Sequence, residues 1–501
     1  MINTDLVNII LGMKVRQGRL EANLNLSEFA SRCDLSPSYI TEIEKGRKYP
    51  KTDKILKMAE VLNKSYDDLV SIKLDPSLTY LETMLSSPLL QQFPFEEFGL
   101  EVGDLVNLFT RVPDKASALL HAIFEIGRQY DMKEEHFLRA ALRSYQEIHE
   151  NYFQDLEDAA TEFTEAYKLR GKLPLEQHAL EKIIRAEFGY ELDTTRLAAQ
   201  PDLAHYRSVF IGGRQPQLLI NSALRPNQVK FVLARELGYQ FLKLKERANT
   251  SAPEKVESFE QVLNDFKASY FAGALLIPRG QILADIQIFF HLDSWSPYRL
   301  LAMLEKYDVT PEMLLYRFCE LIPQFFGVKL HFHRFHQIDD HAFQLVKQLN
   351  MNRLLLPSGS GLHEHHCRRW LAIRLLREME QSEPSPNHTH DAPLVGVQIS
   401  KFLDLPDGFL SFGFARPLAL SPHVGSSVVV GFRLSPNLKE TIRFVDDPTI
   451  PTVIINETCE RCPLVGEQCL VRGADPTILL VEKQQAERRA ALRQLVAEVQ
   501  K

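Results

Sequence analysis

Apolar positions recur at helical spacing along the first 70 residues, and polar capping and turn residues separate the groups. This pattern predicts about five short helices. Asn25, followed three residues later by Glu28, is typical of a capping box that begins the second helix. Ser36 and Pro37 together are typical of the start of the third helix, which we expect Gly46 to end.

The helical pattern continues to residue 167, with its strongest segments at residues 100–124 and 136–167. Two apolar runs then surround Gly212 and Gly213, and they predict a β-hairpin over residues 208–220. Further helices are expected over residues 226–245, 256–276 and 298–321.

The pattern changes beyond residue 325, where short apolar runs of β type alternate with loops. Residues 382–393 are rich in serine, proline and histidine, which indicates a loop. Residues 477–499 have the charge pattern of a solvated amphipathic helix and are suited to a dimer contact. The expected strands lie at residues 328–332, 408–414, 427–432 and 452–455.

The composition is that of a folded protein whose length suits about three domains. The 501 residues are 45% hydrophobic, and 58 lysines and arginines against 65 acids leave a formal net charge of -7. This balance excludes a protein that is basic throughout, so any nucleic-acid contact must use a local patch. The start of the chain lacks the features of an export signal, and no stretch has the ~18 apolar residues of a membrane span. We therefore expect a cytoplasmic protein.

Such a basic patch follows the third expected helix. Between Lys45 and Lys57 the sequence has six basic residues and one acid, Asp53, so this edge can neutralise phosphates. Ile40 and Ile43 are expected to take the buried side of the helix, which leaves its polar side for base edges. The base-reading candidates are Ser38, Thr41 and Glu42, with Pro37 beside them, and the phosphate candidates are Lys45, Arg47, Lys48 and Lys51.

This region resembles the helix-turn-helix of the Cro and phage-repressor type, also called the xenobiotic-response-element (XRE) family. The matching features are Glu28-Phe29-Ala30, residues 36–44, the Glu-x-Gly ending at Gly46, and Pro50. The resemblance implies that the third helix enters the major groove and that a dimer reads two half-sites about 34 Å apart. Leu26 stands where the family often has a glutamine that touches phosphate. The alternative is a helix-turn-helix that binds a protein partner.

Residues 171–323 resemble the IrrE/ImmA-like metallopeptidase domain. The features that match are the hairpin, the long helix with Arg235-Glu236-Leu237-Gly238-Tyr239, and the later Ala268-Ser269-Tyr270-Phe271-Ala272. In that family the helix carries His-Glu-x-x-His, whose histidines bind zinc and whose glutamate activates water. Arg235 and Tyr239 stand in place of both histidines, and an arginine cannot lose its proton to bind a metal.

The resemblance places the third zinc ligand of the family near Lys267, with Asp265 the nearest carboxylate. Glu236 alone cannot build a zinc site, so we expect no catalytic residues and no enzyme activity. Without a metal, Glu236 is expected to pair with Arg235 or Lys267 and to have a structural role.

Residues 325–480 resemble the C-terminal domain of the short-chain fatty acyl regulators, a family of transcription factors with the same order of domains. The matching elements are Cys367-Arg368-Arg369-Trp370, residues 405–408 and 428–434, and Cys459-x-x-Cys462-Pro463 followed by Cys469. The resemblance implies a sensor of short-chain acyl-CoA esters that controls metabolic genes.

The four C-terminal cysteines are suited to a metal site. Cys459 and Cys462 have CxxC spacing, and Cys469 with Cys367 would complete four thiolate ligands for zinc or an iron–sulfur cluster. Reduced, buried thiols are the other interpretation. The alternative metal ligands are His363, His365 and His366, and the basic candidates for acyl-CoA phosphates, equally suited to a solvated helix face, are Arg368, Arg369, Arg374 and Arg377.

Together these features predict a mainly α N-terminal half, an α+β metallopeptidase-like middle domain and an α+β C-terminal domain. The function expected is that of a dimeric transcriptional regulator that binds double-stranded DNA and an effector such as a short-chain acyl-CoA. The alternatives are an antitoxin-like interaction protein and a zinc peptidase that acts on a repressor. The expected domains are a helix-turn-helix at residues 1–72, a helical connector at 73–170, a degenerate peptidase-like domain at 171–323, a sensor domain at 324–480 and a charged helix at 481–501.

Overall fold

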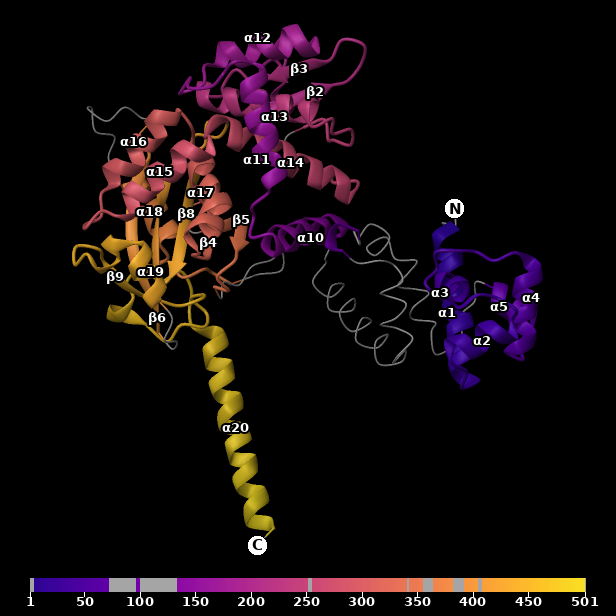
Figure 1. Ribbon diagram of the computed structural model, residues 1–501. Coiled ribbons are helices and arrows are strands. Elements are labelled where there is room, and N and C mark those ends of the chain that lie inside the picture. Colours follow the sequence, from indigo (N-terminus) through magenta and orange to yellow (C-terminus); the bar gives the residue numbers. More distant parts are fainter. Residues whose placement is uncertain are drawn as a thin grey trace. The chain divides into compact units, whose positions relative to one another are not determined.

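The computed structural model describes residues 4–71, 96–99, 133–250, 255–339, 342–354, 364–381, 392–403 and 408–500 (Figure 1). The chain divides into two compact units, Met1–Tyr145 with Glu257–Phe259 and Gln146–Val256 with Glu260–Lys501. The predicted helix at residues 100–124 and most of the predicted connector lie outside the described residues. Among the helices that are described, none is both long and apolar enough to span a membrane.

Five helices form the N-terminal region, as the apolar spacing predicted. The predicted capping box is present: Asn25 accepts a hydrogen bond from the Glu28 N–H at 2.9 Å, and Glu28 accepts one from the Asn25 N–H at 3.0 Å. Ser36 caps the third helix through the Tyr39 N–H at 3.2 Å, and Pro37 is its first residue. The helices are α1 (Thr4–Glu21), α2 (Leu26–Arg32), α3 (Pro37–Glu44), α4 (Thr52–Val61) and α5 (Tyr66–Val70).

Helices α1 and α3 approach closely because Gly12 of α1 has no side chain. A Cβ at this position would collide with the backbone carbonyl oxygen of Ile43. This contact and a shared apolar core fix the inner side of α3. The core includes Val15, Phe29, Ile40, Met58 and Leu69, one from each helix.

The next region combines helices with a small sheet. The predicted hairpin is present as antiparallel β2 (Ser208–Ile211) and β3 (Gln217–Ile220), and β1 (Glu191–Asp193), which we did not predict, pairs parallel to β3. The helices of this part of the chain are α10 (Glu134–Ile148), α11 (Gln154–Ala166), α12 (Gln177–Phe188), α13 (Pro226–Phe241), α14 (Phe259–Leu276), α15 (Arg279–Phe290), α16 (Pro297–Tyr307) and α17 (Pro311–Phe326).

The segment predicted to be helical over residues 298–321 is helical but divides into two helices. The segment forms α16 and α17, and the chain turns between them at Asp308, whose φ is 47°. Thr310 then caps α17 by accepting a hydrogen bond from the Met313 N–H, and Pro311 is the first helical residue. A residue in the left-handed region ends a helix, so the apolar spacing alone does not reveal the break.

A six-stranded sheet forms the C-terminal domain, in the order β5-β4-β8-β7-β6-β9. Four of its strands overlap the predicted runs, whereas β5 and β6 were missed. All neighbours are antiparallel except β6 and β9, which are parallel. The strands are β4 (Leu330–Gln337), β5 (Phe343–Asn350), β6 (Leu394–Phe402), β7 (Gly408–Pro417), β8 (Gly425–Arg433) and β9 (Thr452–Ile455).

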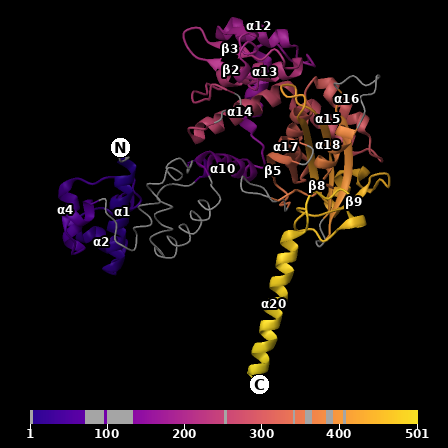
Figure 2. The ribbon, with the colours of Figure 1, turned by 180° about the vertical axis from the view of Figure 1, so that it is seen from behind.

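The two faces of this sheet pack against different helices (Figure 2). Helix α18 (Leu371–Gln381) covers the face that carries Phe335 and Val429, together with Trp370. The opposite face carries Phe412 and Phe432, whose rings contact Phe289, Phe290 and Phe318 of α15 and α17. Alternating residues of each strand therefore build two separate apolar layers.

Acidification is expected to destabilise this sheet through His331, which is 1% exposed and whose Nδ1 contacts Asn352. Burial lowers the pKa of His331 from 6.5 to about 4. The unfolded chain therefore binds a proton between these values while the folded chain does not, so the free energy of unfolding falls as the pH falls from 6.5 to 4. The expected loss at pH 5 is about 2 kcal/mol.

Urea unfolding at pH 7 and pH 5 measures this effect. The variant His331→Gln keeps a polar side chain without a titrating group, so its stability should change less between the two pH values. An equal change in both proteins would rule out His331 as the cause.

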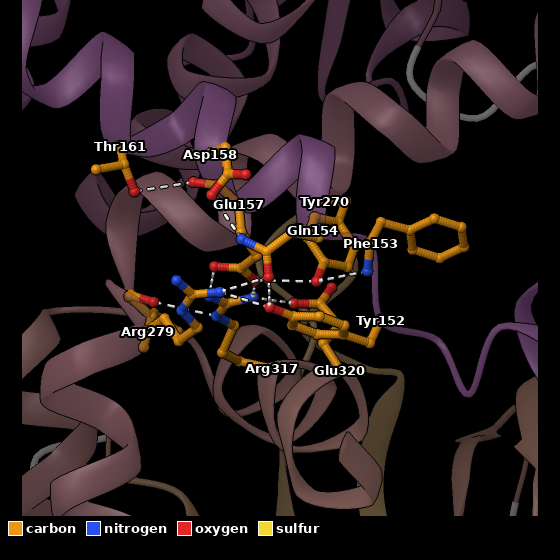
Figure 3. A network of polar contacts seen from close by, with 11 residues as sticks. Tyr152, Phe153, Gln154, Glu157, Asp158, Thr161, Tyr270, Arg279, Arg317 and Glu320 are labelled. Carbon is orange, nitrogen blue, oxygen red and sulfur yellow. Dashed lines mark hydrogen bonds and ion pairs between the residues drawn. The ribbon is translucent and has the colours of Figure 1, made fainter. Parts of the chain in front are cut away.

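A buried ion cluster joins α11, α14 and α17 (Figure 3). Arg317 of α17 is 1% exposed and binds both carboxylate oxygens of Glu157 at 2.6 and 2.9 Å. The same guanidinium donates to Glu320 at 2.8 Å, and the hydroxyl of Tyr270 donates to Glu157 at 2.9 Å. The arginine thus links two carboxylates that lie far apart in the sequence.

The predicted terminal helix is present as α20 (Thr477–Val499). Both ribbon views show it projecting away from the six-stranded sheet (Figures 1 and 2). None of its residues is buried.

Candidate functional site

Helix α3 presents one polar side because its other side is buried. Ile40 and Ile43 are fully buried, whereas Ser38 is exposed and Thr41 and Glu42 are half-buried. The three base-reading candidates therefore lie away from the core, with Pro37 at the start of the same helix. Their contact with bases stays a prediction.

The contacts of these candidates leave part of their hydrogen-bonding capacity available. The hydroxyl of Thr41 donates to the Pro37 carbonyl at 2.9 Å, and its oxygen keeps acceptor capacity. The Ser38 hydroxyl lies 3.1 Å from that of Ser36. Glu42 accepts a hydrogen bond from Arg47 at 3.2 Å, so DNA binding by either residue would compete with this pair.

A buried ion pair fixes the orientation of α3, and the sequence analysis missed it. Arg19 of α1 donates to Glu44 at 2.6 and 2.9 Å and to the Leu24 carbonyl at 3.0 Å. The hydrogen bond to Glu44 raises the pKa of Arg19 above its ordinary value. The available signal was an acidic residue directly after Ile43, on the inner side of the helix.

The predicted phosphate-binding residues surround the end of α3 and the start of α4. Arg47, Lys48 and Lys51 are exposed, and Lys45 is half-buried. The ammonium groups of Lys48 and Lys54 lie 5.7 and 4.2 Å from the centre of the Tyr39 ring, which orders them on the same side. The geometry therefore gathers positive charge beside the polar side of α3.

The second candidate site lies on α13, where the related peptidases have two zinc-binding histidines. Arg235 pairs with Asp265 of α14, and the Tyr239 hydroxyl donates to the same carboxylate at 3.2 Å. Asp265 is the carboxylate that the sequence placed nearest to the third ligand position. A guanidinium therefore binds the carboxylate nearest to that position.

The ionisation of Arg235 and Tyr239 is unsuited to metal binding. Burial disfavours the charged form of Arg235, but Asp265, Tyr239 and Glu236 together outweigh it and raise the pKa above its ordinary value. Burial also raises the pKa of Tyr239, and Asp265 adds to the rise. The guanidinium keeps its charge and the phenol keeps its proton, so neither side chain offers a free lone pair of the kind that zinc needs.

The expected partner of Glu236 is wrong. Its carboxylate pairs with Arg247, at 2.6 and 2.8 Å, and not with Arg235 or Lys267. Arg247 also stacks 3.8 Å from the centre of the Phe210 ring and 4.0 Å from that of Tyr239. Arg247 belongs to no sequence motif and lies in the loop after α13. The structural role expected for Glu236 agrees with this pairing.

The C-terminal cysteines lie on neighbouring segments. Burial raises the pKa of Cys367 to about 11, with a contribution from nearby Cys459 and Cys462. Cys459 accepts a hydrogen bond from the Gly473 N–H at 3.3 Å, and Cys469 is half-buried. His365 pairs with Glu460 at 2.7 Å, and His363 lies outside the described residues.

Across the described ranges of the chain, no three or more His, Cys, Asp or Glu side chains are arranged to hold a metal ion. We therefore derive no role for a metal. The four-cysteine site stays a prediction, which metal analysis of the chain purified without chelator would test.

The arginines near Trp370 have protein partners. Arg369 donates to the Ile454 and Gln468 carbonyls, and Arg374 donates to the Val397 carbonyl at 3.1 Å. The guanidinium of Arg368 lies 4.4 Å from the centre of the Phe343 ring. These contacts support a structural role for this group rather than an open phosphate site.

Comparison with known proteins identifies two of the regions. The helix-turn-helix family model matches residues 15–69, and the model of the IrrE N-terminal-like domain matches residues 188–318. The control protein C.BamHI of Bacillus amyloliquefaciens is 35% identical over 68 residues, which cover 13% of this chain and 84% of that protein. A Mycobacterium tuberculosis transcriptional regulator is similar with a TM-score of 0.44 and 17% identity, over 67% of this chain and 93% of that chain.

The matches coincide with the two candidate sites. The helix-turn-helix match contains α3 and its basic residues, and the second match contains Arg235, Glu236 and Tyr239. The chain therefore belongs to the helix-turn-helix family of DNA-binding transcriptional regulators, and it carries an IrrE N-terminal-like domain after that module.

Proposed function

We propose that this chain binds operator DNA as a homodimer and changes the transcription of metabolic genes in response to a small effector. The observation that carries the proposal is the polar side of α3 next to exposed Arg47, Lys48 and Lys51, in a chain whose net charge is -7. A local positive surface in an acidic protein suits a specific duplex contact rather than general adhesion to nucleic acid.

Sequencing of the DNA bound by the full chain in cells, followed by gel shifts on the recovered sequences, tests this proposal. We expect a small set of sites with paired half-sites and an affinity that falls as salt rises. No shift with any recovered sequence would refute operator binding. A protein that binds to α3 in place of DNA would favour an antitoxin-like function.

We infer that the IrrE-like domain has no peptidase activity. Two ion pairs within the protein support the inference: Arg235 is paired with Asp265, and Glu236 is paired with Arg247. Incubation of the full chain with zinc and a general protease substrate should give no cleavage. Stoichiometric zinc that is lost on Glu236→Gln, together with cleavage, would contradict the inference.

The effector that we propose is a short-chain acyl-CoA, and its support is the resemblance of the C-terminal domain to the short-chain fatty acyl regulators. Binding would shift the population of dimer arrangements and so change the fit to two half-sites. Acetyl-, propionyl- and butyryl-CoA should each be measured for their effect on the melting temperature and on DNA affinity. No effect of any ester on either quantity would exclude this class of effector.

The dimer contact that we propose is α20. Val481, Leu492, Leu495 and Val499 are 52, 61, 57 and 78% exposed. At 100° per residue these four positions share one side of the helix, so a second α20 can cover them. The expected result of Leu495→Glu is a monomer at concentrations where the unchanged chain is a dimer, as measured by light scattering.

The matched control is Ala486→Glu, which adds the same charge on the opposite side of α20 and should leave the dimer intact. Dissociation of both variants, or of neither, would contradict a contact through the side that carries Leu495.

A further inference from the structure

A group of basic side chains gathers at one end of the six-stranded sheet. Arg334 of β4 lies directly opposite Lys347 of β5, and Ser426 of β8 lies between His336 of β4 and Arg416 of β7. Residues that are directly opposite, or two apart on one strand, share a face. Arg334, His336, Lys347 and Arg416 are therefore on the same face.

Two further arginines reach this group from the IrrE-like domain. Arg207 directly precedes β2, and Arg225 is the cap residue of α13. Arg207 acts electrostatically on Glu312, and Arg225 acts on Arg416, so both lie close to the end of the sheet. We call Arg207, Arg225, Arg334, Lys347 and Arg416 the cationic cluster.

The carboxylate of Glu312 is shared by most of the cluster. It lies 2.8 Å from Arg334, in the first turn of α17. Burial would raise the pKa of Glu312, but Arg334, Lys347, Arg207 and Arg416 together hold it at about 2. Glu320 is a second carboxylate, and it acts electrostatically on Lys347. The four cations that act on Glu312 outnumber these two carboxylates, so the end of the sheet carries excess positive charge.

Water screens these positive charges less than it would on a fully exposed surface. Burial, followed by the repulsion of Arg225, lowers the pKa of Arg416 to about 10. Burial likewise lowers the pKa of Arg207. Repulsion among desolvated cations opposes folding, so the cluster needs an anion that the described residues supply only in part.

The cluster remains accessible to a ligand. Arg207, Arg225, Arg334 and Arg416 are half-buried, and Lys347 is exposed. The ammonium of Lys347 lies 3.7 Å from the centre of the Tyr316 ring, which holds it at the cluster. The side chains are therefore surrounded by protein but still open to small anions.

We infer that the cationic cluster is a binding site for a small molecule that carries a diphosphate or several phosphate groups. Guanidinium groups bind phosphate oxygens in pairs, and several arginines from different elements can surround more than one phosphate. A ligand held there would contact β2 and α13 as well as the sheet. It would therefore link the IrrE-like domain to the C-terminal domain.

This inference deepens the proposed function and rests on it only for the regulatory role of the ligand. It differs from the basic residues that the sequence suggested for an acyl-CoA, since Arg368, Arg369 and Arg374 are bound to other parts of the protein. The cluster recognises phosphate, whether a coenzyme or a free nucleotide carries it.

The test is calorimetric titration and thermal melting of the full chain with sodium pyrophosphate, at constant ionic strength and without DNA. We expect saturable binding and a melting temperature that rises with pyrophosphate more than with sodium chloride of equal ionic strength. Arg416→Gln should weaken binding by at least about tenfold. Lys401→Gln, at the exposed position of β6 opposite Gly408 and at the other end of the sheet, should not.

The stability of the unliganded variants separates a ligand site from a structural one. Removal of an uncompensated cation should leave the melting temperature of Arg416→Gln unchanged or higher without anion. A clear fall without anion, combined with no response of the unchanged chain to pyrophosphate, would overturn the inference. Equal weakening by Lys401→Gln would also overturn it, because binding would then follow total charge.

Two further ligands identify the source of the phosphate. ADP and unacylated coenzyme A should both compete with pyrophosphate, and the tighter of the two indicates the class of natural ligand. Failure of all three to bind would overturn the inference. The measurements omit DNA, so they remain informative even if operator binding fails.

Discussion

Alanine at Lys45, Arg47 and Lys48 together is expected to lower the affinity of the full chain for operator DNA by about 100-fold at about 150 mM salt. Arg47 and Lys48 are exposed at the end of α3, and Lys45 is its half-buried cap residue. Each phosphate contact contributes about 0.9 to the slope of log affinity against log salt, so three lost contacts should reduce that slope by about 3. Fluorescence anisotropy at several salt concentrations measures both quantities.

The matched control replaces three exposed basic residues of the other compact unit, Arg299, Lys401 and Arg443, by alanine. This variant has the same change in net charge and should keep both the affinity and the salt slope. A similar loss of affinity in both triple variants would mean that net charge, and not the surface beside α3, attracts the duplex.

Arg317→Met is expected to lower the free energy of unfolding by about 3–5 kcal/mol. The side chain is 1% exposed and makes four hydrogen bonds, to Glu157, Glu320 and the Ile277 carbonyl. Its removal leaves Glu157 and Glu320 buried without the guanidinium that binds both. Burial already raises the pKa of Glu320 to about 7, despite the opposing effect of Arg317, so the loss of this arginine should favour the protonated acid still further.

Urea unfolding of the full chain, followed by far-ultraviolet circular dichroism, measures this loss. Arg299→Met, at an exposed position of α16, is the matched control and should change stability by less than about 0.5 kcal/mol. Glu157→Gln and Glu320→Gln added to Arg317→Met should recover part of the loss, because they remove the buried charges. A triple variant less stable than Arg317→Met would show that packing, and not charge, dominates.

The N-terminal region could be predicted well because its signals are local. Asn25, Glu28, Ser36 and Pro37 act within one turn of the helix that they begin, and the structure has each in the expected role. The Arg19–Glu44 pair was not predictable in the same way, since it joins residues 25 positions apart. Which acid an arginine meets depends on how two helices pack.

The C-terminal sheet was predicted only in part for a related reason. Gly396 interrupts the apolar pattern of β6, and a glycine in such a position suggests a turn. In the structure it leaves space for Leu375 of α18, whose side chain would collide with a Cβ there. Gly396 is thus required by a contact between β6 and α18 and not by a turn of the backbone.

In the middle domain, neither the sequence motif nor the family resemblance predicted the ion-pair partners of Glu236 and Asp265. The loss of two zinc-binding positions was readable from Arg235 and Tyr239, but the replacement network required Arg247, which belongs to no motif. Asp265 was the nearest carboxylate by sequence, and the structure gives it a partner.

The pairing of Arg235 with Asp265 has a consequence for how this scaffold is maintained in the cell. Its central positive charge is covalently part of the chain, so no chelating agent can extract it and no competing ion can exchange with it. We therefore expect this ion pair to persist whether or not trace metals are supplied.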